Sequence, residues 1–374
     1  MGVYERLGVR PLINAHATMS YLGGSIPHPE VVAAMVEASR SFVNTFELQR
    51  AAGRRLAELT NNEAAFVTAG AGAGMLFSAV AVMAGGDEAK LQQLPDTSGM
   101  KSEAIALAVN PNPYHRCVLP TGMTVRWVGD PERPTADELE REIDPATACC
   151  LYFVNNELEG KQLPLTTVVD VCHRHGVPVV VDAAAQIPAF ENTWRFTREM
   201  GADIAVFSGG KGFRGPQSSG LVVGTTELVE GMLKVCPPTM SVGRAAKASR
   251  EQIVGLVTAV ELMAPRSAEE IYATYEVRLE TIQRGLTGMP GLSVCRRFGT
   301  DVGKPFHHLR VAVDRTIAGL DGPGLVKALD EGDPRIAVGQ LPGGELAINA
   351  ETLDPGEEDL VVRRIAEILD RAIQ

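Results

Sequence analysis

The sequence predicts a mainly parallel α/β domain followed by a smaller α+β domain. Between residues 64 and 224, short apolar runs alternate with longer helical patterns, and this alternation is typical of a parallel sheet covered by helices. After residue 288, short strand patterns lead to a closing amphipathic helix over 357–373. The predicted divisions are an N-terminal arm and helix over 1–45, a large domain over 46–240 and a small domain over 241–374.

Each predicted element follows from its local pattern. Pro29 begins a helix because proline suits the first turn and an apolar stripe follows. The run from 177 to 181 is β-branched, as in buried parallel strands. The predicted strands are 64–68, 104–109, 124–128, 149–154, 177–182, 204–207, 221–223, 292–294, 308–313, 336–338 and 346–348, and the other predicted helices are 48–60, 75–83, 165–175, a helix ending near 263, and 266–286.

The composition excludes several classes of protein. The chain has 374 residues, of which 45% are hydrophobic and 22% charged, which is ordinary for a globular protein. A net charge of -11 argues against a nucleic acid partner. No apolar run is long enough to cross a membrane and the N-terminus lacks a signal core, so no membrane association and a cytoplasmic location are expected. The six cysteines include no C-x-x-C pair, so no metal site is predicted.

A glycine-rich stretch, 69–74, joins the strand at 64–68 to an apolar helix. Strand, glycine turn and helix together form a phosphate cradle, because free N–H groups and the helix dipole attract an anion. The dinucleotide pattern G-x-G-x-x-G would require glycine at Met75 or Phe77, which counts against a nicotinamide dehydrogenase. A glycine-packed helix contact is the alternative, and phosphate binding is favoured over it.

Two charged residues each follow a predicted strand, where open α/β sheets bind their ligands. The run 177–181 ends on Asp182, and Lys211 stands among four glycines after the run 204–207. Taken singly, Asp182 fits a helix N-cap and Lys211 fits a surface turn. Pyridoxal phosphate needs both a lysine for its aldehyde and a carboxylate for its ring nitrogen. The pair therefore predicts a pyridoxal phosphate site with Lys211 as the Schiff-base lysine.

Further residues are candidates for binding a substrate. Arg214 lies in the lysine loop, while Arg244 and Lys247 belong to a basic cluster over 243–250 that opens a predicted helix, where cations are disfavoured unless an anion binds nearby. His16 lies in a polar N-terminal arm that either packs or covers a site. An aromatic or histidine side chain within 110–115 is a candidate for stacking on the cofactor ring, and a proline-rich connection is an equal alternative.

At these residues the chain resembles fold-type I pyridoxal phosphate enzymes of the class-V aminotransferase kind, and within them the selenocysteine-synthase-like group. The resemblance covers nearly the whole chain. It rests on residues 13–15, 18–19, 22–25, 94–101, 181–186, 207–211, 214–217, 243–244 and 247. His16 and Ala17 depart from it where relatives commonly carry a glycine before Thr18, and Asn110 departs from it where a histidine is expected.

The resemblance implies a role for each matching residue. Lys211 holds the cofactor aldehyde and moves protons, and Asp182 pairs with the ring nitrogen. Ala184 packs beneath the ring and Gln186 reaches the ring hydroxyl. The phosphate is held by Gly70, Ala71, Gly72 and Ser208. The resemblance also implies a homodimer or larger homo-oligomer with shared sites.

The predicted activity is chemistry at Cα of a small-molecule amino acid substrate. The favoured reaction is α,β-elimination by a carbon–nitrogen lyase, which converts a hydroxylated, anionic amino acid or amino sugar acid into a 2-oxo acid and ammonia. A racemase, an aldolase or a β-replacement transferase would use the same residues. A non-catalytic scaffold of the same fold is the alternative outside enzymes, and the presence of both Lys211 and Asp182 counts against it.

Overall fold

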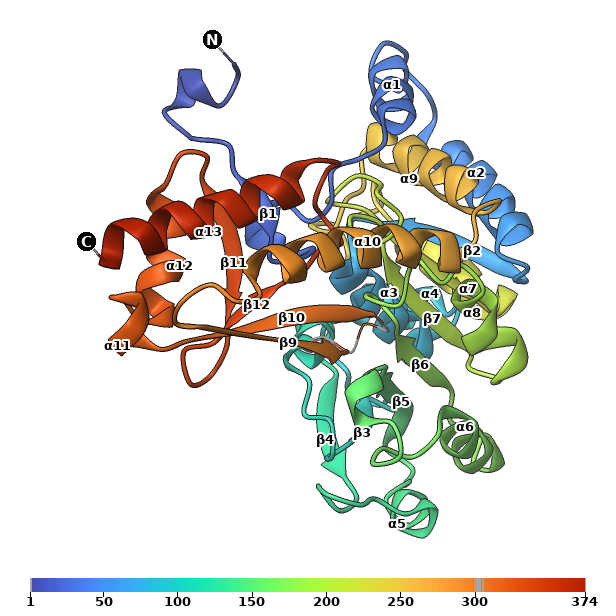
Figure 1. The fold of residues 1–374 in the computed structure, drawn as a ribbon. Helices are drawn as coiled ribbons and strands as arrows, with labels where there is room; N and C mark the ends of the chain where they lie inside the picture. Colours follow the sequence, from blue (N-terminus) through green and yellow to red (C-terminus); the bar gives the residue numbers. More distant parts are fainter. Residues whose placement is uncertain (1, 300–303, 305, 374) are drawn as a thin grey trace. The chain divides into compact units, whose positions relative to one another are not determined.

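The computed structural model describes residues 2–299, 304 and 306–373 (Figure 1). The chain forms two compact units: a large unit, Ile26–Ser267, and a small unit that combines Met1–Ser25 with Ala268–Gln374. This division differs from the predicted boundaries at 45/46 and 240/241. One reason is that α9 (Arg250–Met263) packs against α1 (Pro29–Ala38) and α2 (Thr45–Leu59), so it belongs to the large unit.

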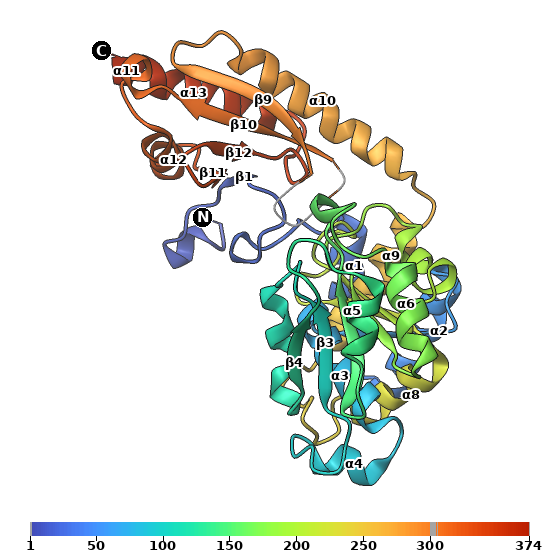
Figure 2. The same ribbon diagram turned by 90° about the horizontal axis from the view of Figure 1, so that it is seen from below.

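The large unit is built on a seven-stranded sheet, which confirms the predicted mainly parallel α/β fold. The strand order is β2-β8-β7-β6-β5-β3-β4, and only β8 runs antiparallel to its neighbours. Figure 2 shows β4 next to β3. The strands are β2 (Ala64–Thr68), β3 (Glu103–Leu107), β4 (Thr124–Val128), β5 (Thr147–Phe153), β6 (Val179–Asp182), β7 (Ile204–Ser208) and β8 (Gly220–Gly224).

Helices cover this sheet, and α3 (Ala71–Ala84) packs against β2, β5, β6, β7 and β8. α3 is apolar on nearly all sides, as expected for a helix enclosed by other elements. The other helices of the large unit are α4 (Glu88–Gln93), α5 (Ala136–Arg141), α6 (Leu165–Arg174), α7 (Asn192–Trp194) and α8 (Thr226–Val235), with 3-10 turns η3 (Pro113–Cys117), η4 (Leu119–Thr121) and η5 (Asn156–Leu158) and the π-helix η6 (Arg195–Glu199). Within the described part of the chain, no helix combines the length and the hydropathy that a membrane crossing requires.

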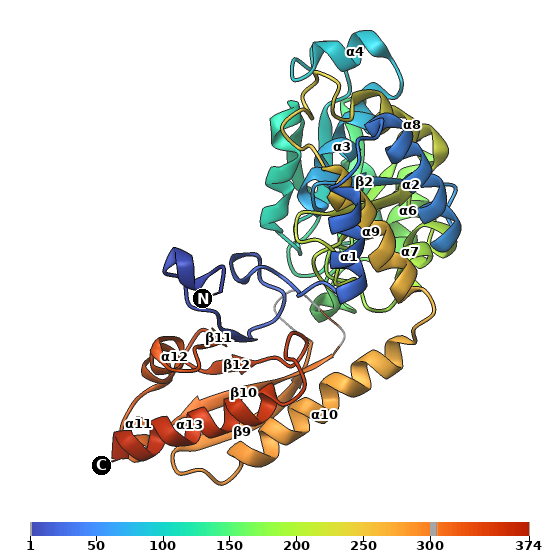
Figure 3. The same cartoon turned by 90° about the horizontal axis from the view of Figure 1, so that it is seen from above.

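The small unit contains a five-stranded sheet in the order β1-β11-β12-β10-β9. The N-terminal arm contributes β1, which pairs in parallel with β11, so this part of the arm belongs to the sheet of the small unit. Figure 3 shows α10 and α13 alongside each other. The elements are η1 (Glu5–Leu7), β1 (Ile13–Ala15), η2 (Ser20–Leu22), α10 (Ala268–Leu286), β9 (Leu292–Phe298), β10 (His307–Val313), α11 (Arg315–Ala318), α12 (Gly322–Glu331), β11 (Ile336–Gln340), β12 (Leu346–Ile348) and α13 (Glu357–Ile373).

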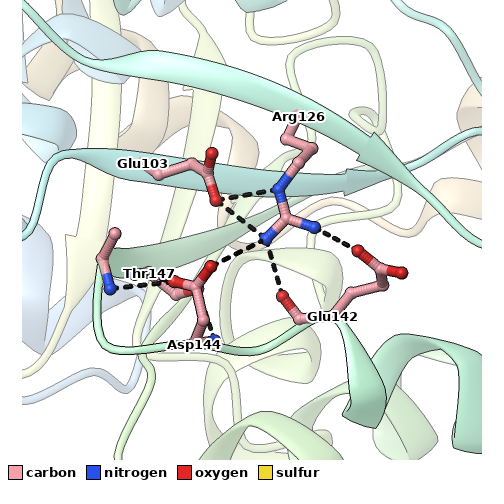
Figure 4. A network of polar contacts seen from close by, with 6 residues as sticks. Glu103, Arg126, Glu142, Asp144 and Thr147 are labelled. Atoms are coloured by element: carbon pink, nitrogen blue, oxygen red, sulfur yellow. Dashed lines mark hydrogen bonds and ion pairs between the residues drawn. The ribbon is translucent and has the colours of Figure 1, made fainter.

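An ion-pair network ties together the three strands at the β4 edge of the large sheet (Figure 4). The Arg126 guanidinium on β4 contacts Glu103 of β3 at 2.8 Å and pairs with Glu142. Asp144, just before β5, lies 3.5 Å from the same guanidinium. Glu103 begins β3 and Asp144 precedes β5, so the network lies at the amino ends of these parallel strands.

We predict that Arg126→Met lowers the free energy of unfolding by about 1–2 kcal/mol, because three carboxylates lose a shared cation. Urea unfolding at neutral pH measures this change. The pKa of the Asp144 carboxyl is lowered, first by the Ala146 N–H and also by Arg126. A lowered native pKa stabilises the fold above the ordinary carboxyl pKa, and this stabilisation is lost as the pH falls through the native value. The difference between wild type and variant should therefore shrink in acid.

Arg174→Met is the matched control, because Arg174 pairs with Glu140 at an exposed position. It should change stability by no more than about 0.5 kcal/mol. Two outcomes would contradict the assigned role of the network: an equal decrease in the free energy of unfolding in both variants, or a decrease in Arg126→Met that does not depend on pH.

Candidate active site

Asp182 and Lys211 are brought together by two neighbouring parallel strands. Asp182 ends β6 and is paired with Val206 of β7, and the Ala183 N–H donates to the Val206 carbonyl at 2.9 Å. Lys211 follows shortly after β7 ends at Ser208. The positive charge of Lys211 acts to lower the pKa of the Asp182 carboxyl, so the two groups lie within electrostatic range of each other.

The electrostatics of Asp182 suit a cationic ligand. Burial has the largest effect on the pKa of the Asp182 carboxyl, and it raises this pKa. The Ala184 N–H, 3.0 Å from Oδ1, and the charge of Lys211 act in the opposite direction without cancelling it. An ionised carboxylate here is therefore held at a cost, and a protonated ring nitrogen beside it would reduce that cost.

The predicted phosphate cradle has the expected local structure. β2 leads to Gly70, which caps α3 with φ of 116°, a value that favours glycine. No side chain among the described residues caps this helix, and its first turn has no acidic residue. The N–H groups of Ala71 and Gly72 at the start of α3 can therefore serve an anion.

Ser208 and the phosphate cradle are separated in the sheet by a single residue, Gly220. Gly220 of β8 is paired with Ser208 of β7 on one side and with Thr68 of β2 on the other. A Cβ on Gly220 would lie 2.6 Å from the carbonyl carbon of Gly70. The absence of a side chain at Gly220 thus allows the turn before α3 to approach the end of β7.

Gln186 provides a buried donor on the same loop as Asp182. Its side chain is 3% exposed, and its Oε1 accepts a hydrogen bond from Asn156 at 3.1 Å. Its Nε2 has no partner among the described residues. Ala184, a small residue between Asp182 and Gln186, is only partly buried. An acceptor such as a ring hydroxyl oxygen would satisfy this orphaned amide.

These residues fit pyridoxal phosphate on structural grounds alone. The uncapped helix suits a phosphate, the partly buried carboxylate of Asp182 suits a ring nitrogen, and the unpartnered amide of Gln186 suits a ring oxygen. Lys211 lies within electrostatic reach of Asp182 and can meet the aldehyde. The residues that would hold the cofactor are Gly70, Ala71, Gly72, Asp182, Ala184, Gln186, Ser208 and Lys211.

Arg214 shares the loop of Lys211. Its N–H donates to the Lys211 carbonyl at 2.9 Å, and its φ of 53° is unusual for a residue other than glycine. Its Nε donates to the Ile26 carbonyl at 2.9 Å. The remaining guanidinium N–H groups make no hydrogen bond to any described residue, so they can serve an anionic substrate.

The helix-terminus argument for Arg244 and Lys247 is wrong. The helix begins later, at Arg250, and Ser249 caps it in a capping box with Gln252. Arg244 and Lys247 lie in the turn before it, where Lys247 is exposed and Arg244 is partly buried. These two cations therefore give no indication of an anion at that helix, and their part in substrate binding stays a prediction.

His16 belongs to the small unit. Its Nδ1 lies 2.7 Å from the Tyr21 hydroxyl, and its ring would be 3.0 Å from a Cβ on Gly339 of β11. The contact with β11 shows that His16 packs within its own unit. Its predicted contribution to substrate binding stays a prediction.

The stretch 110–115 contains two side chains that are engaged within the large unit. The amide of Asn110 donates to the Phe153 carbonyl at 2.9 Å, and His115 packs edge-on against Trp127 at 5.3 Å. Tyr114 is 53% exposed. Cys117, at the end of η3, is a site residue that the sequence did not predict. Its Sγ lies against Gly72, and the charge of Asp182 contributes to its raised pKa.

The fold and this arrangement of residues define a fold-type I pyridoxal phosphate enzyme. The chain matches the aminotransferase class-V family over residues 30–254, and it belongs to that family. This confirms the predicted cofactor.

Two curated proteins are similar over nearly their whole length. The chain is 30% identical over 376 residues to the 5'-C-glycyluridine monooxygenase-decarboxylase of Streptomyces sp, covering 98% of this chain and 92% of that protein. It is 29% identical over 378 residues to the D-glucosaminate-6-phosphate ammonia lyase of Salmonella typhimurium (strain 14028s / SGSC 2262), covering 99% of this chain and 98% of that protein. A solved structure of D-glucosaminate-6-phosphate ammonia-lyase superposes with a TM-score of 0.86 at 26% identity and 100% coverage of both chains.

We predict that borohydride reduction of the protein loaded with pyridoxal phosphate attaches the pyridoxyl group to Lys211, because this amine lies beside Asp182 at the candidate site. Peptide mapping by mass spectrometry locates the modified lysine. The Lys211→Ala variant should still bind pyridoxal phosphate without a covalent bond, and borohydride should leave it unlabelled. A label on another lysine of the wild type would overturn the assignment.

A second prediction concerns Asp182→Asn. The pKa of Asp182 is raised in the fold, so ionisation destabilises the cofactor-free protein as the pH rises through the native value. The neutral variant should therefore be more stable than wild type at neutral pH without cofactor, and this gain should vanish in acid. Thermal unfolding at several pH values measures it.

The same variant should bind pyridoxal phosphate roughly ten- to a hundred-fold more weakly, because a charge-assisted hydrogen bond is worth about 1.5–3 kcal/mol. Asp203→Asn is a control for a carboxylate that accepts a backbone N–H, here from Val179 at 2.7 Å, at the opposite end of β6. It should leave cofactor affinity unchanged. Unaltered affinity in Asp182→Asn would mean that the carboxylate only caps the loop.

Proposed function

We propose that this chain is a carbon–nitrogen lyase that uses pyridoxal phosphate. The substrate is a hydroxylated, anionic amino acid or amino sugar acid, and the products are a 2-oxo acid and ammonia. The supporting observation is the full-length similarity to an ammonia lyase in a chain that brings Lys211 and Asp182 to adjacent strand ends.

The proposed roles of the residues follow from their chemistry. When bound, pyridoxal phosphate withdraws electrons from the bonds at the substrate Cα. Asp182 holds a proton at the ring nitrogen, which strengthens that withdrawal. The Lys211 Nζ takes the proton from Cα, and the β-hydroxyl departs as water after receiving a proton. Water then replaces the amine, so the net change is R–CHOH–CH(NH3+)–COO− to R–CH2–CO–COO− and NH4+.

The proposed substrate site uses cations near the lysine loop. Arg214 is the strongest candidate, because it shares the loop of Lys211 and keeps guanidinium N–H groups available. Arg244, Lys247 and His16 are the further candidates. A carboxylate or a sugar phosphate on the substrate would be the anion that these groups bind.

The relative from Streptomyces favours a second candidate. Its name describes oxidative decarboxylation, and it is as similar to this chain as the lyase is. An enzyme of that kind also acts at Cα, but it consumes oxygen and releases carbon dioxide. Racemisation, aldol cleavage and β-replacement likewise begin at Cα and use the same residues.

A substrate screen of the reconstituted protein separates these reactions. Hydroxylated amino acids and phosphorylated amino sugar acids are supplied, and 2-oxo acid, ammonia, oxygen uptake and carbon dioxide are followed together. Equal release of 2-oxo acid and ammonia without oxygen uptake supports the lyase. Oxygen uptake with carbon dioxide release replaces it with the second candidate, and racemisation alone overturns both.

The proposed assembly is a homodimer or larger homo-oligomer, as the family resemblance implies. Exposed apolar side chains gather on and around α1 and the start of α2: Ile26, Val32, Val36, Phe42, Val43 and Phe46, with Phe42 97% exposed. We call this set the α1–α2 patch. A second copy of the chain would cover it and remove this apolar area from water. The proposed location is the cytoplasm, where reducing conditions suit the six free cysteines.

We predict that Arg214→Gly raises the Michaelis constant for the anionic substrate roughly ten- to a hundred-fold, because one charge-assisted contact is lost. Glycine tolerates the positive φ at this position, so the loop should keep its conformation. Steady-state kinetics with an intact cofactor spectrum check this. Arg195→Ala, at an exposed position, is the control, and equal kinetics in the two variants would remove Arg214 from the substrate site.

We predict that Phe42→Asp shifts the protein from oligomer to monomer, because a charge at the centre of the α1–α2 patch opposes its burial. Light scattering measures the molar mass. Ile317→Asp, which is 52% exposed in the small unit, should leave the oligomer intact. A wild-type monomer, or an unchanged mass for Phe42→Asp, would reject the patch as the interface.

A further inference from the structure

The residue at the end of η3 lies against the start of the phosphate cradle. η3 packs on α3, and Cys117 is its last residue. The Sγ atom of Cys117 is 3.1 Å from the position that a Cβ on Gly72 would take. The thiol therefore touches the first turn of α3, and glycine at position 72 provides the room for it. Cys117 is only partly buried, unlike Cys149, Cys150, Cys172 and Cys236.

The same thiol also experiences the charge of the Asp182 carboxylate. Burial raises the pKa of Cys117, and the negative charge of Asp182 raises it further. Such an effect places the Asp182 carboxylate within electrostatic range of the Cys117 thiol. Cys117 thus touches the first turn of α3 and lies within electrostatic range of Asp182, and its raised pKa keeps the thiol protonated at neutral pH.

The chemical structure of pyridoxal phosphate relates these two neighbours to each other. The phosphate arm is attached to a ring carbon that is separated from the ring nitrogen by one further carbon. A side chain between the phosphate cradle and the partner of the ring nitrogen consequently faces that edge of the ring. The buried, unpartnered Nε2 of Gln186, on the loop that follows Asp182, independently indicates a ligand beside that loop.

Resting on the cofactor site proposed above, we propose that Cys117 contacts the pyridine ring of bound pyridoxal phosphate along the edge between the phosphate arm and the ring nitrogen. His115 is already packed on Trp127, and Asn110 donates to the backbone of β5. Cys117, which lies against the phosphate cradle, completes the ring pocket in this proposal. An uncharged thiol there leaves Asp182 as the anion opposite the ring nitrogen.

The contact predicts that the cofactor shields Cys117 from alkylation. The cofactor-free protein is treated with N-ethylmaleimide, and the modification rate of each cysteine is followed by peptide mass mapping with and without saturating pyridoxal phosphate. Cys117 should react at least about ten times more slowly when the cofactor is bound. Cys295, which is exposed in the small unit, is the matched control and should react at one rate in both samples.

Two further measurements distinguish contact with the ring from other causes of a slower Cys117 alkylation. Inorganic phosphate alone should fill the cradle and leave Cys117 reactive, because it has no ring. Cys117→Ala should lower the affinity for pyridoxal phosphate several-fold and leave the unfolding temperature of the cofactor-free protein unchanged.

The outcomes distinguish this inference from the cofactor assignment. If visible absorption shows binding while Cys117 keeps its full reactivity, the ring contact is overturned and the cofactor site stands. If phosphate alone shields Cys117 as well as the cofactor does, the contact is with the cradle and the inference is overturned. If pyridoxal phosphate does not bind, both proposals fail.

Discussion

The candidate site depends on the parallel pairing of β6 with β7. Parallel neighbours end at the same edge of a sheet, so the last residue of β6 and the loop after β7 must meet there. The pairing of Asp182 with Val206 fixes this register, and a shift of one residue would turn Asp182 to the other face. The attraction between Asp182 and Lys211 is thus a consequence of backbone hydrogen bonds between two buried strands.

Charged groups have different surroundings at the amino ends and at the carboxyl ends of the strands of the large sheet. At the amino ends of β3 and β4, Arg126 is surrounded by carboxylates that balance it. At the carboxyl ends, burial raises the pKa of Asp182 and an amide of Gln186 has no partner within the described chain. The paired charges around Arg126 stabilise the fold, whereas the unpartnered amide of Gln186 and the raised pKa of Asp182 are features found at ligand sites. The cofactor-free protein is therefore destabilised at the carboxyl ends of the strands, where the cofactor would bind.

Much of this could be predicted from the sequence, because the informative signals are local. The β-branched run before Asp182 and the glycine turn after Thr68 each encode a strand end or a helix start, and the structure has both. The helix before Met263 was placed too early because Ser249, whose side chain caps it, was not recognised. Cys117 could not be identified, since its position depends on how η3 packs against α3, and local patterns do not specify such contacts.

The parallel pairing of β1 with β11 has a consequence for the order of folding. The small unit contains both ends of the chain, and the large unit is a continuous segment between them. During synthesis the large unit can fold as soon as it leaves the ribosome, whereas β1, which is made before the large unit, has to wait for β11, which is made after it. Removing the first fifteen residues would take a strand from the C-terminal sheet and leave the edge of β11 open to pairing with other chains.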